Sequence, residues 1–200
     1  MSNEVDTDHP VLEIIASRWS PYSFDGRPVP DEDMLSIFEA ARWAPSSYNE
    51  QPWHYIIAGK ENKEEFETML LCLVEANQLW AKNAPVLALG ITRLSFIRND
   101  KPNRAAIHDL GLASMNLVLE ATARGIAVHQ MIGIEPGRIR NVYNVPEGFE
   151  PVTGLAIGYA ASPDRMPEAL RERDLTRRTR RPLKEFIFSG KWGQVSGLVK

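Results

Sequence analysis

Apolar residues recur at the spacing of an amphipathic helix in several segments of the chain. Val11, Ile14 and Ile15 predict a short helix that ends near Arg18, before Pro21. The same spacing predicts further helices at residues 31–41, 62–74, 104–124 and 136–143. The side chains expected to face the core from these helices are Met34, Leu35, Phe38, Ala41, Phe66, Met69, Leu70, Leu73, Val74, Ile107, Leu110, Leu117, Val118, Ala121, Ile139, Val142 and Tyr143.

Residues at the ends of these segments agree with helix boundaries. Asp31 is a candidate N-cap, and Asn62 with Glu65 three positions later resembles a capping box. Pro136 suits the first position of a helix, and Gly125 can adopt the left-handed conformation that ends one. The helix boundaries are thus predicted by two independent kinds of signal.

Four short apolar segments, each bounded by Pro or Gly, predict strands. They lie at residues 53–58, 86–92, 127–132 and 152–159. Strands separated by helices over one chain of 200 residues indicate a single α/β layered domain with a central sheet.

Composition and charge exclude several classes of protein. Hydrophobic residues make up 44% of the chain and charged residues 24%, as in a globular protein. The net charge of −3 gives no general attraction to nucleic acid or to anionic lipid. No apolar run approaches the roughly 20 residues that span a bilayer. Residues 1–9 lack the pattern of a signal peptide, and Cys72 is the single cysteine, so we expect a cytoplasmic protein without an internal disulfide.

The segment between Pro45 and Pro52 has the most informative chemistry. Its hydroxyls and amides can donate and accept hydrogen bonds without adding charge, which suits the edge of a heteroaromatic ring. A loop whose polar side chains cap the local backbone is the alternative, and residue chemistry alone favours that alternative. The polar residues concerned are Ser46, Ser47, Asn49 and Gln51.

Three further segments suit an anionic or planar ligand. Arg18-Trp19-Ser20 and Arg180-Arg181 place guanidinium groups where a phosphate could bind, although residue chemistry alone favours solvated surface charge. Met131-Ile132-Gly133 can present a backbone N–H after a strand, or form an ordinary turn. Neither a dinucleotide-binding glycine motif nor a P-loop is present, and the four histidines have no metal-binding spacing.

In their order along the chain, these segments resemble the nitroreductase family of FMN-dependent oxidoreductases. The similarity covers nearly the whole chain, and the ordered set is far more specific than any one of its members. The segments that carry it are residues 17–24, 41–53, 108–113, 125–133, 145–148, 156–159 and 180–183.

The resemblance implies an α+β fold in which helices flank a mixed central sheet, within an interlocked homodimer. It implies one FMN-binding domain over residues 1–200, whose extension from about residue 162 to 200 reaches the partner subunit. Two FMN sites at the dimer interface would take residues from both chains. The implied FMN contacts are Arg18, Trp19, Ser20, Tyr22, Pro45, Ser46, Ser47, Asn49, Gln51, Met131, Ile132, Gly133, Arg180 and Arg181.

Two positions depart from the family pattern. Tyr22 stands where the family usually has Arg or Lys, and Trp19 replaces a common Arg or His. One cation is therefore missing, or is replaced by another residue such as Lys82. Because nearby positive charge favours reduced, anionic flavin, both changes bear on FMN affinity and reduction potential.

The implied activity is ping-pong reduction of an electron-poor small molecule by NADH or NADPH through bound FMN, with no catalytic protein nucleophile. Nitroaromatics, quinones and activated alkenes are candidate acceptors. The alternatives are another flavin reaction on the same fold, such as dehalogenation or flavin destruction, and a non-catalytic flavin-binding or sensing protein. Neither a nucleic acid nor a membrane is an expected partner, and the sequence does not identify the acceptor or the preferred nicotinamide.

Overall fold

The computed structural model describes residues 5, 7–162, 164, 167–176 and 178–199. Its centre is a four-stranded sheet in the order β1-β2-β4-β3. Every pair of neighbouring strands is antiparallel. The α+β class is confirmed, but the pairings among these four strands are not of the mixed kind that the resemblance implied. The strands are β1 (Trp53–Gly59), β2 (Val86–Arg93), β3 (Ala127–Met131) and β4 (Phe149–Gly158).

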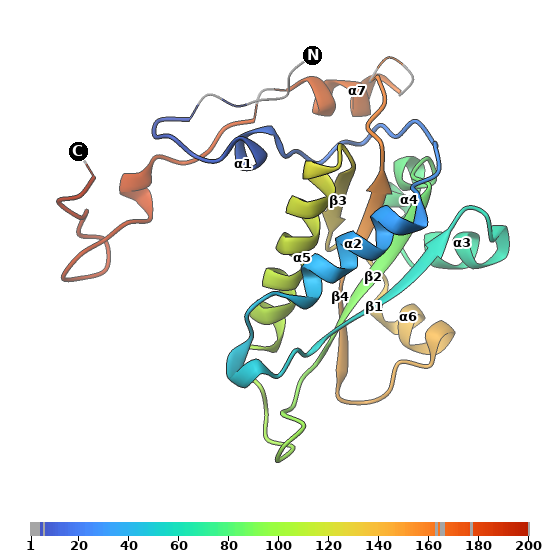
Figure 1. Cartoon of the computed structure of the whole chain (residues 1–200), viewed down its shortest axis with the longest axis horizontal. Helices are drawn as coiled ribbons and strands as arrows, with labels where there is room; N and C mark the ends of the chain where they lie inside the picture. Colours follow the sequence, from blue (N-terminus) through green and yellow to red (C-terminus); the bar gives the residue numbers. More distant parts are fainter. Residues whose placement is uncertain (1–4, 6, 163, 165–166, 177, 200) are drawn as a thin grey trace.

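Helices cover both faces of the sheet (Figure 1). One side carries α2 (Asp31–Arg42) and the long α5 (Ala106–Ala123). On the other side lie α3 (Lys63–Leu70), α4 (Glu75–Ala81) and α6 (Pro136–Tyr143). Other helices in the described part of the chain are α1 (Glu13–Ser17), α7 (Glu168–Leu175) and the short 3-10 turns η1 (Ser47–Asn49) and η3 (Leu183–Glu185).

The alternation of side chains along β2 divides the core into two parts. Val86 and Ala88 pack with residues of α2 and α5, such as Leu117. Leu87 and Leu89 point to the opposite face, where they join the cluster under α3, α4 and α6. Because both faces of β2 are covered, the strand has no polar side chain from Val86 to Ile91 and does not alternate with polar residues there.

Most of the predicted boundaries are confirmed. The Asn62 side chain accepts a hydrogen bond from the backbone N–H of Glu65 at 3.3 Å, Pro136 begins α6, and Gly125 has a φ of 70°. Asp31 is the first residue of α2 and not its N-cap, a position that Pro30 occupies. The helix boundaries are thus largely local in origin.

The helix predicted over residues 62–74 ends earlier, at Leu70. Leu73 forms a β-bridge with Ile134, and the N–H of Val74 donates to the carbonyl of Gly133 at 3.1 Å. Hydrogen bonds to a segment distant in sequence therefore replace the next helical turn, and a separate helix, α4, follows. The apolar spacing did not predict this break.

Three apolar residues predicted to face the core are instead exposed. The exposed fractions are 73% for Leu35, 55% for Ile107 and 39% for Val142. Ile107 lies one turn before the exposed Gly111 and two turns before Met115, so the outer face of α5 is apolar. These predictions were wrong because helical spacing shows which residues share a face but not which face the core covers.

The C-terminal part leaves the sheet after β4. Residues 183–199 extend away from the body of the molecule (Figure 1). This arm exposes 95% of Trp192 and 83% of Leu198, and it folds back on itself through a bridge between Phe188 and Val195. Within the predicted extension, residues 163, 165, 166, 177 and 200 lie outside the described residues.

Candidate functional site

An arginine cluster lies where α1 ends and the chain after α7 returns. Arg18 donates to the Ser20 hydroxyl at 3.3 Å. Arg178 donates to the Ala16 carbonyl at 3.1 Å and to the Arg18 carbonyl as well. The structure therefore brings Arg178, which precedes the predicted Arg180-Arg181 segment, against the Arg18 segment across about 160 residues of sequence.

The cations of this cluster oppose one another. Burial lowers the pKa of Arg18, and the Arg180 charge lowers it further. Burial also lowers the pKa of Arg178, with the charges of Arg18 and Arg180 acting in the same direction. Since an arginine remains protonated in proteins, such crowding favours the arrival of an anion that neutralises it.

The two C-terminal arginines that the sequence suggested differ in position. Arg180 is exposed and donates to the Thr179 carbonyl at 2.8 Å, yet its charge acts on both Arg18 and Arg178. Arg181 is also exposed, and among the described residues its charge is not a cause of either shift. Arg178, which the sequence reasoning missed, is the better-placed second cation.

The segment that carries Arg18 and Ser20 is held by α7. The Asp174 carboxylate accepts the backbone N–H groups of Tyr22 at 2.8 Å and Ser23 at 3.1 Å. This contact spans more than 150 residues of sequence, and no local pattern signals it. Asp174 is therefore a positioning residue for the arginine cluster.

Tyr22 and Trp19 are placed differently from charged ligands of a cofactor. The Tyr22 ring meets Trp80 at 5.1 Å and His129 at 4.7 Å between ring centroids, and the guanidinium of Arg173 lies 5.5 Å from the Tyr22 ring. Trp19 is half-buried beside Arg18. Tyr22 thus belongs to an aromatic group at the edge of the core, while Lys82, the suggested replacement cation, is exposed at the end of α4.

The loop at residues 45–52 is fixed by hydrogen bonds from outside and from within. Ser47 donates its N–H to the Asp109 carboxylate at 3.0 Å, and Asp109 is only 2% exposed in the first turn of α5. The Ser46 hydroxyl accepts from the N–H of Gln51 at 3.0 Å, and the Gln51 amide donates to the Asn49 carbonyl at 3.1 Å. Pro45 is exposed beside them.

Three residues of this loop have the left-handed backbone conformation that side chains rarely adopt. The φ angles are 55° for Tyr48, 56° for Asn49 and 51° for Gln51. Each such residue costs on the order of 1 kcal/mol or more, and strain of this kind concentrates at functional sites. The buried Asp109 supplies a contact that maintains the strained loop.

The loop after β3 is the third predicted part of the site. Met131 is buried, whereas Ile132 is 87% exposed. The Gly133 carbonyl accepts from the Asn77 amide at 3.0 Å, and a Cβ on Gly133 would lie 2.4 Å from the Asn77 nitrogen. A side chain at position 133 would require the Asn77 and Val74 side chains to shift, and Asn77 joins the set of residues that the sequence reasoning missed.

Within one chain the predicted site is divided. Asp109 holds the 45–52 loop at the start of α5, whereas α1 with the arginine cluster lies against the other end of that helix (Figure 1). With 18 residues, α5 is roughly 27 Å long. The two predicted parts of the site therefore lie at opposite ends of this helix.

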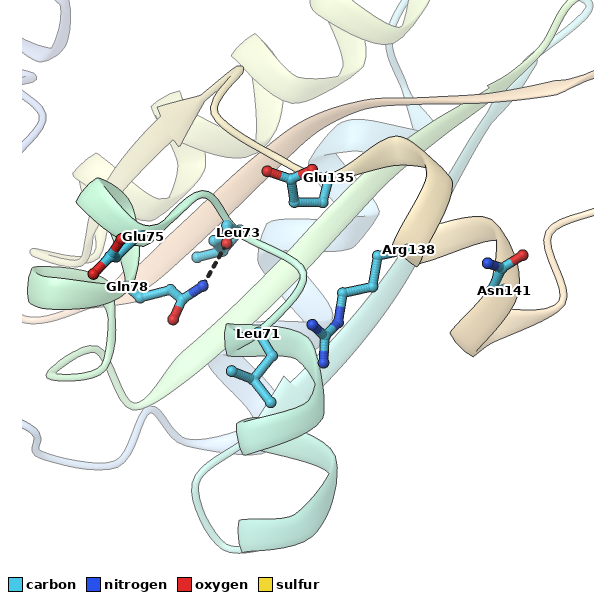
Figure 2. A pocket seen from close by; sticks show the side chains of 7 residues that line it. All are labelled: Leu71, Leu73, Glu75, Gln78, Glu135, Arg138 and Asn141. Atoms are coloured by element: carbon cyan, nitrogen blue, oxygen red, sulfur yellow. Dashed lines mark hydrogen bonds between the residues drawn. The ribbon is translucent and has the colours of Figure 1, made fainter.

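A cavity of about 560 Å³ lies elsewhere, between the start of α4 and α6 (Figure 2). It contains none of the predicted site residues. Its polar lining mixes one cation with two carboxylates and two amides, and no ligand class follows from that mixture. The lining residues are Leu71, Leu73, Glu75, Gln78, Glu135, Arg138 and Asn141.

Within the described residues no helix is long and apolar enough to cross a bilayer. In the same part of the chain, no group of three or more His, Cys, Asp or Glu side chains could hold a metal ion. The arginine cluster and the 45–52 loop thus remain the chemically distinctive features of the fold.

The fold is that of the nitroreductases. A nitroreductase family protein of Clostridium difficile, 23% identical, matches with a TM-score of 0.70 over 92% of this chain and 99% of its own. A crystal structure described as an oxidoreductase containing FMN matches with a TM-score of 0.90 and 37% identity, over 96% of this chain and 98% of its own.

Sequence comparison gives the same answer. The Nitroreductase family profile matches residues 15–159. A relative from Methanothermobacter thermautotrophicus, provisionally named NADH dehydrogenase/NAD(P)H nitroreductase, is 30% identical over 76% of this chain and 78% of its own. The chain therefore belongs to the nitroreductase family and is an enzyme of the oxidoreductase class.

Proposed function

We propose that this enzyme binds FMN and uses NADH or NADPH to reduce an electron-poor small molecule, such as a nitroaromatic, a quinone or an activated alkene, in two-electron steps. The convergence of Arg18, Arg178 and Arg180 beside the Ser20 hydroxyl carries the proposal. The FMN-containing structure that is 37% identical supports the choice of cofactor, and the name of the archaeal relative supports the choice of electron donor.

The arginine cluster fits the phosphate of FMN. A phosphate brings up to two negative charges and three acceptor oxygens, which match crowded guanidinium groups and a hydroxyl. Burial and mutual repulsion already lower the pKa values of Arg18 and Arg178, so a bound phosphate relieves an existing cost. Arg18, Ser20, Arg178 and Arg180 are the residues that would hold it.

The neutral polar groups fit the flavin ring. Ser46, Ser47, Asn49 and Gln51 offer donors and acceptors without charge, and the loop with Met131, Ile132 and Gly133 offers backbone groups. When bound, FMN supplies the exchange of a hydride equivalent that protein side chains cannot perform. For a quinone acceptor, the net reaction takes a hydride from NAD(P)H and one proton from water to give the hydroquinone and NAD(P)⁺.

A homodimer completes the proposed site. The arginine cluster of one chain and the 45–52 loop of its partner would enclose one FMN, and symmetry would create a second site. Two unpaired apolar surfaces support this assembly: the outer face of α5 with Ile107 and Met115, and the C-terminal arm with Trp192 and Leu198. Electron donor and acceptor would then enter the same site in turn, as ping-pong kinetics requires.

A cytoplasmic setting is part of the proposal. Cys72, the single cysteine, is fully buried and has no partner for a disulfide within the chain. Nothing in the fold therefore depends on an oxidising compartment.

The decisive test begins with purified full-length protein under anaerobic conditions. We expect a yellow protein whose absorbance near 450 nm bleaches on addition of NADH or NADPH, as is general for flavins, and returns when a quinone is added. A colourless protein that does not take up added FMN would overturn the proposal.

A non-catalytic flavin-binding role is the second candidate. Tyr22, packed against Trp80 and His129, leaves an aromatic ring where the family usually has a cation, and this favours weaker stabilisation of reduced flavin. Anaerobic reduction kinetics separate the two roles. A carrier would bind FMN but react negligibly with either nicotinamide over minutes.

A further inference from the structure

Tyr48, Phe96 and Arg98 form an exposed aromatic and cationic platform next to the 45–52 loop. The Tyr48 ring meets the Phe96 ring nearly at right angles, with 5.7 Å between centroids. The Arg98 guanidinium lies 4.2 Å from the centroid of Tyr48 and 5.3 Å from that of Phe96. Tyr48 is nevertheless 73% exposed, so these contacts leave much of its surface open to a ligand.

The backbone holds the two halves of this Tyr48–Arg98 platform together. The left-handed φ of 55° at Tyr48 directs its side chain away from the core. The Glu50 carboxylate accepts the N–H of Ile97, which ties the 94–103 loop to the 45–52 loop. The platform is thus a built feature of two connected loops and not a chance contact between mobile side chains.

The acids near the platform are engaged with other groups. Asp100 accepts from the Ser95 hydroxyl at 2.8 Å and pairs with Arg93 at 3.4 Å, and Glu50 accepts the Ile97 amide. Arg98 itself forms no ion pair within the described part of the chain. Its charge is therefore available to an anionic group lying against the rings.

The place of the platform defines what it would contact. Tyr48 lies between Ser47 and Asn49, two of the residues proposed to meet the flavin ring. A substrate that stacks on that ring therefore has the platform at its border. Aromatic faces favour a flat molecule, and a guanidinium favours a carboxylate.

We propose that the Tyr48–Arg98 platform makes the enzyme selective for flat electron acceptors that carry a carboxylate over neutral acceptors of the same shape. This inference rests on the proposed function, since it concerns the same site. The rings of Tyr48 and Phe96 receive the acceptor edge, and Arg98 pairs with its carboxylate.

The test compares 4-nitrobenzoate with 4-nitrobenzyl alcohol, which share a ring and a nitro group but differ in charge. Each nitro group takes up two electrons and two protons and releases water as it becomes a nitroso group. The holoprotein is first reduced with one equivalent of NADH and then mixed anaerobically with either acceptor. Only the half-reaction with the acceptor is followed, so any contact between Arg98 and the phosphates of NADH does not enter the rate.

For Arg98→Gln we expect the second-order rate constant for 4-nitrobenzoate to fall about fivefold, as for a partly solvated ion pair. The rate constant for the alcohol should stay the same. Arg98→Lys should lie between, because it keeps the charge and loses the planar stacking. Arg104→Gln, a change to an exposed arginine just before α5, is the matched control and should alter neither rate.

The possible outcomes have different meanings. A yellow, reducible holoprotein in which Arg98→Gln slows both acceptors equally, or neither, overturns the platform and leaves the proposed function intact. A purified protein that contains no flavin and takes up none would contradict the proposed function itself. A preference for 4-nitrobenzoate that disappears in high salt, together with the loss in Arg98→Gln, would support the charge pairing.

Discussion

Arg18 illustrates how a single residue acquires its role from its surroundings. At the end of a five-residue helix it could be a solvated charge. Instead it is half-buried, its side chain reaches Ser20, and its carbonyl is occupied by Arg178. Such a cation has lost part of its hydration without gaining a counter-ion from the described chain, so it has most to gain from a phosphate.

Removing the Arg18 charge should weaken FMN binding through the phosphate. For Arg18→Ala we expect the dissociation constant of FMN to rise about 10- to 100-fold, the effect of one charge-assisted contact of about 1.5–3 kcal/mol. Fluorescence quenching of FMN measures it. Riboflavin, which lacks the phosphate, should bind wild type and variant alike, and Arg42→Ala removes a surface arginine paired with Glu39 as a control. An equal loss for both flavins would contradict the phosphate role.

At the scale of elements, α5 and β3 anchor the loops that we propose carry the chemistry. Asp109 connects the first turn of α5 to the strained 45–52 loop. His129 of β3 bonds through Nδ1 to the Pro21 carbonyl at 2.8 Å and so fixes the segment after α1. Both anchors are buried or half-buried polar groups, whose loss costs more than the loss of a surface contact.

The Asp109 anchor should be measurable as stability. Asp109→Ala leaves the Ser47 N–H without its acceptor, and we expect the free energy of unfolding in urea to fall by about 1–3 kcal/mol. Asp109→Asn keeps a side-chain oxygen that can accept, so it should recover most of the loss. Equal destabilisation by both substitutions would show that the charge of Asp109 matters and not its hydrogen bond.

His129 should make stability depend on pH. Burial lowers the pKa of His129 below its ordinary value of 6.5, and the Arg18 charge acts in the same direction, whereas the bond to Pro21 and the Asp174 charge oppose this. The unfolded chain therefore binds the proton first as the pH falls through 6.5. The stability that the neutral His129 side chain contributes is therefore present above pH 6.5 and is lost as the pH falls below it.

We expect the Tm of wild type to fall more between pH 7.5 and pH 5.5 than the Tm of His129→Gln. Comparing the change of Tm with pH in the two proteins cancels the contribution of carboxylates, because these titrate in both. It also cancels any destabilisation by the substitution that is the same at every pH. Parallel Tm curves for the two proteins would remove His129 as the source.

At the scale of the whole molecule, one chain leaves two kinds of surface unpaired. The α5 face with Ile107 and Met115 and the arm with Trp192 and Leu198 expose apolar side chains that an isolated soluble protein seldom exposes together. The division of the proposed site between the two ends of α5 also favours a homodimer, because a partner chain could complete the site. We therefore expect assembly and cofactor binding to depend on one another.

Deletion of residues 183–200 tests this link. Light scattering after size-exclusion chromatography should give the mass of two chains for the full protein and of one chain for the truncated one. The truncated protein should also lose FMN, although it keeps Arg18, Arg178 and Arg180. An intact far-ultraviolet circular dichroism spectrum controls for folding. A truncated dimer that retains FMN would contradict the role of the arm.

What the sequence predicted well is local. The four strands, the Asn62 cap and the Gly125 turn follow from residues only a few positions apart, and the structure confirms them. The break before α4 was not predicted because it depends on Gly133, more than 50 residues away from Val74. The prediction that Ile107 faces the core failed for a related reason, because apolar spacing does not show which face of a helix other elements cover.

By itself, the sequence determined most of the elements, because short-range sterics, capping and apolar spacing act within a few residues. Its ordered motifs placed the chain in its family, and that resemblance implied the α+β class. Only the tertiary structure decided which distant groups meet: Arg178 with Arg18, Asp174 with Tyr22, and Asp109 with Ser47. These contacts depend on the strand order and on how the helices pack over the sheet. Both result from the small interaction energies of many residues, and no single motif encodes them.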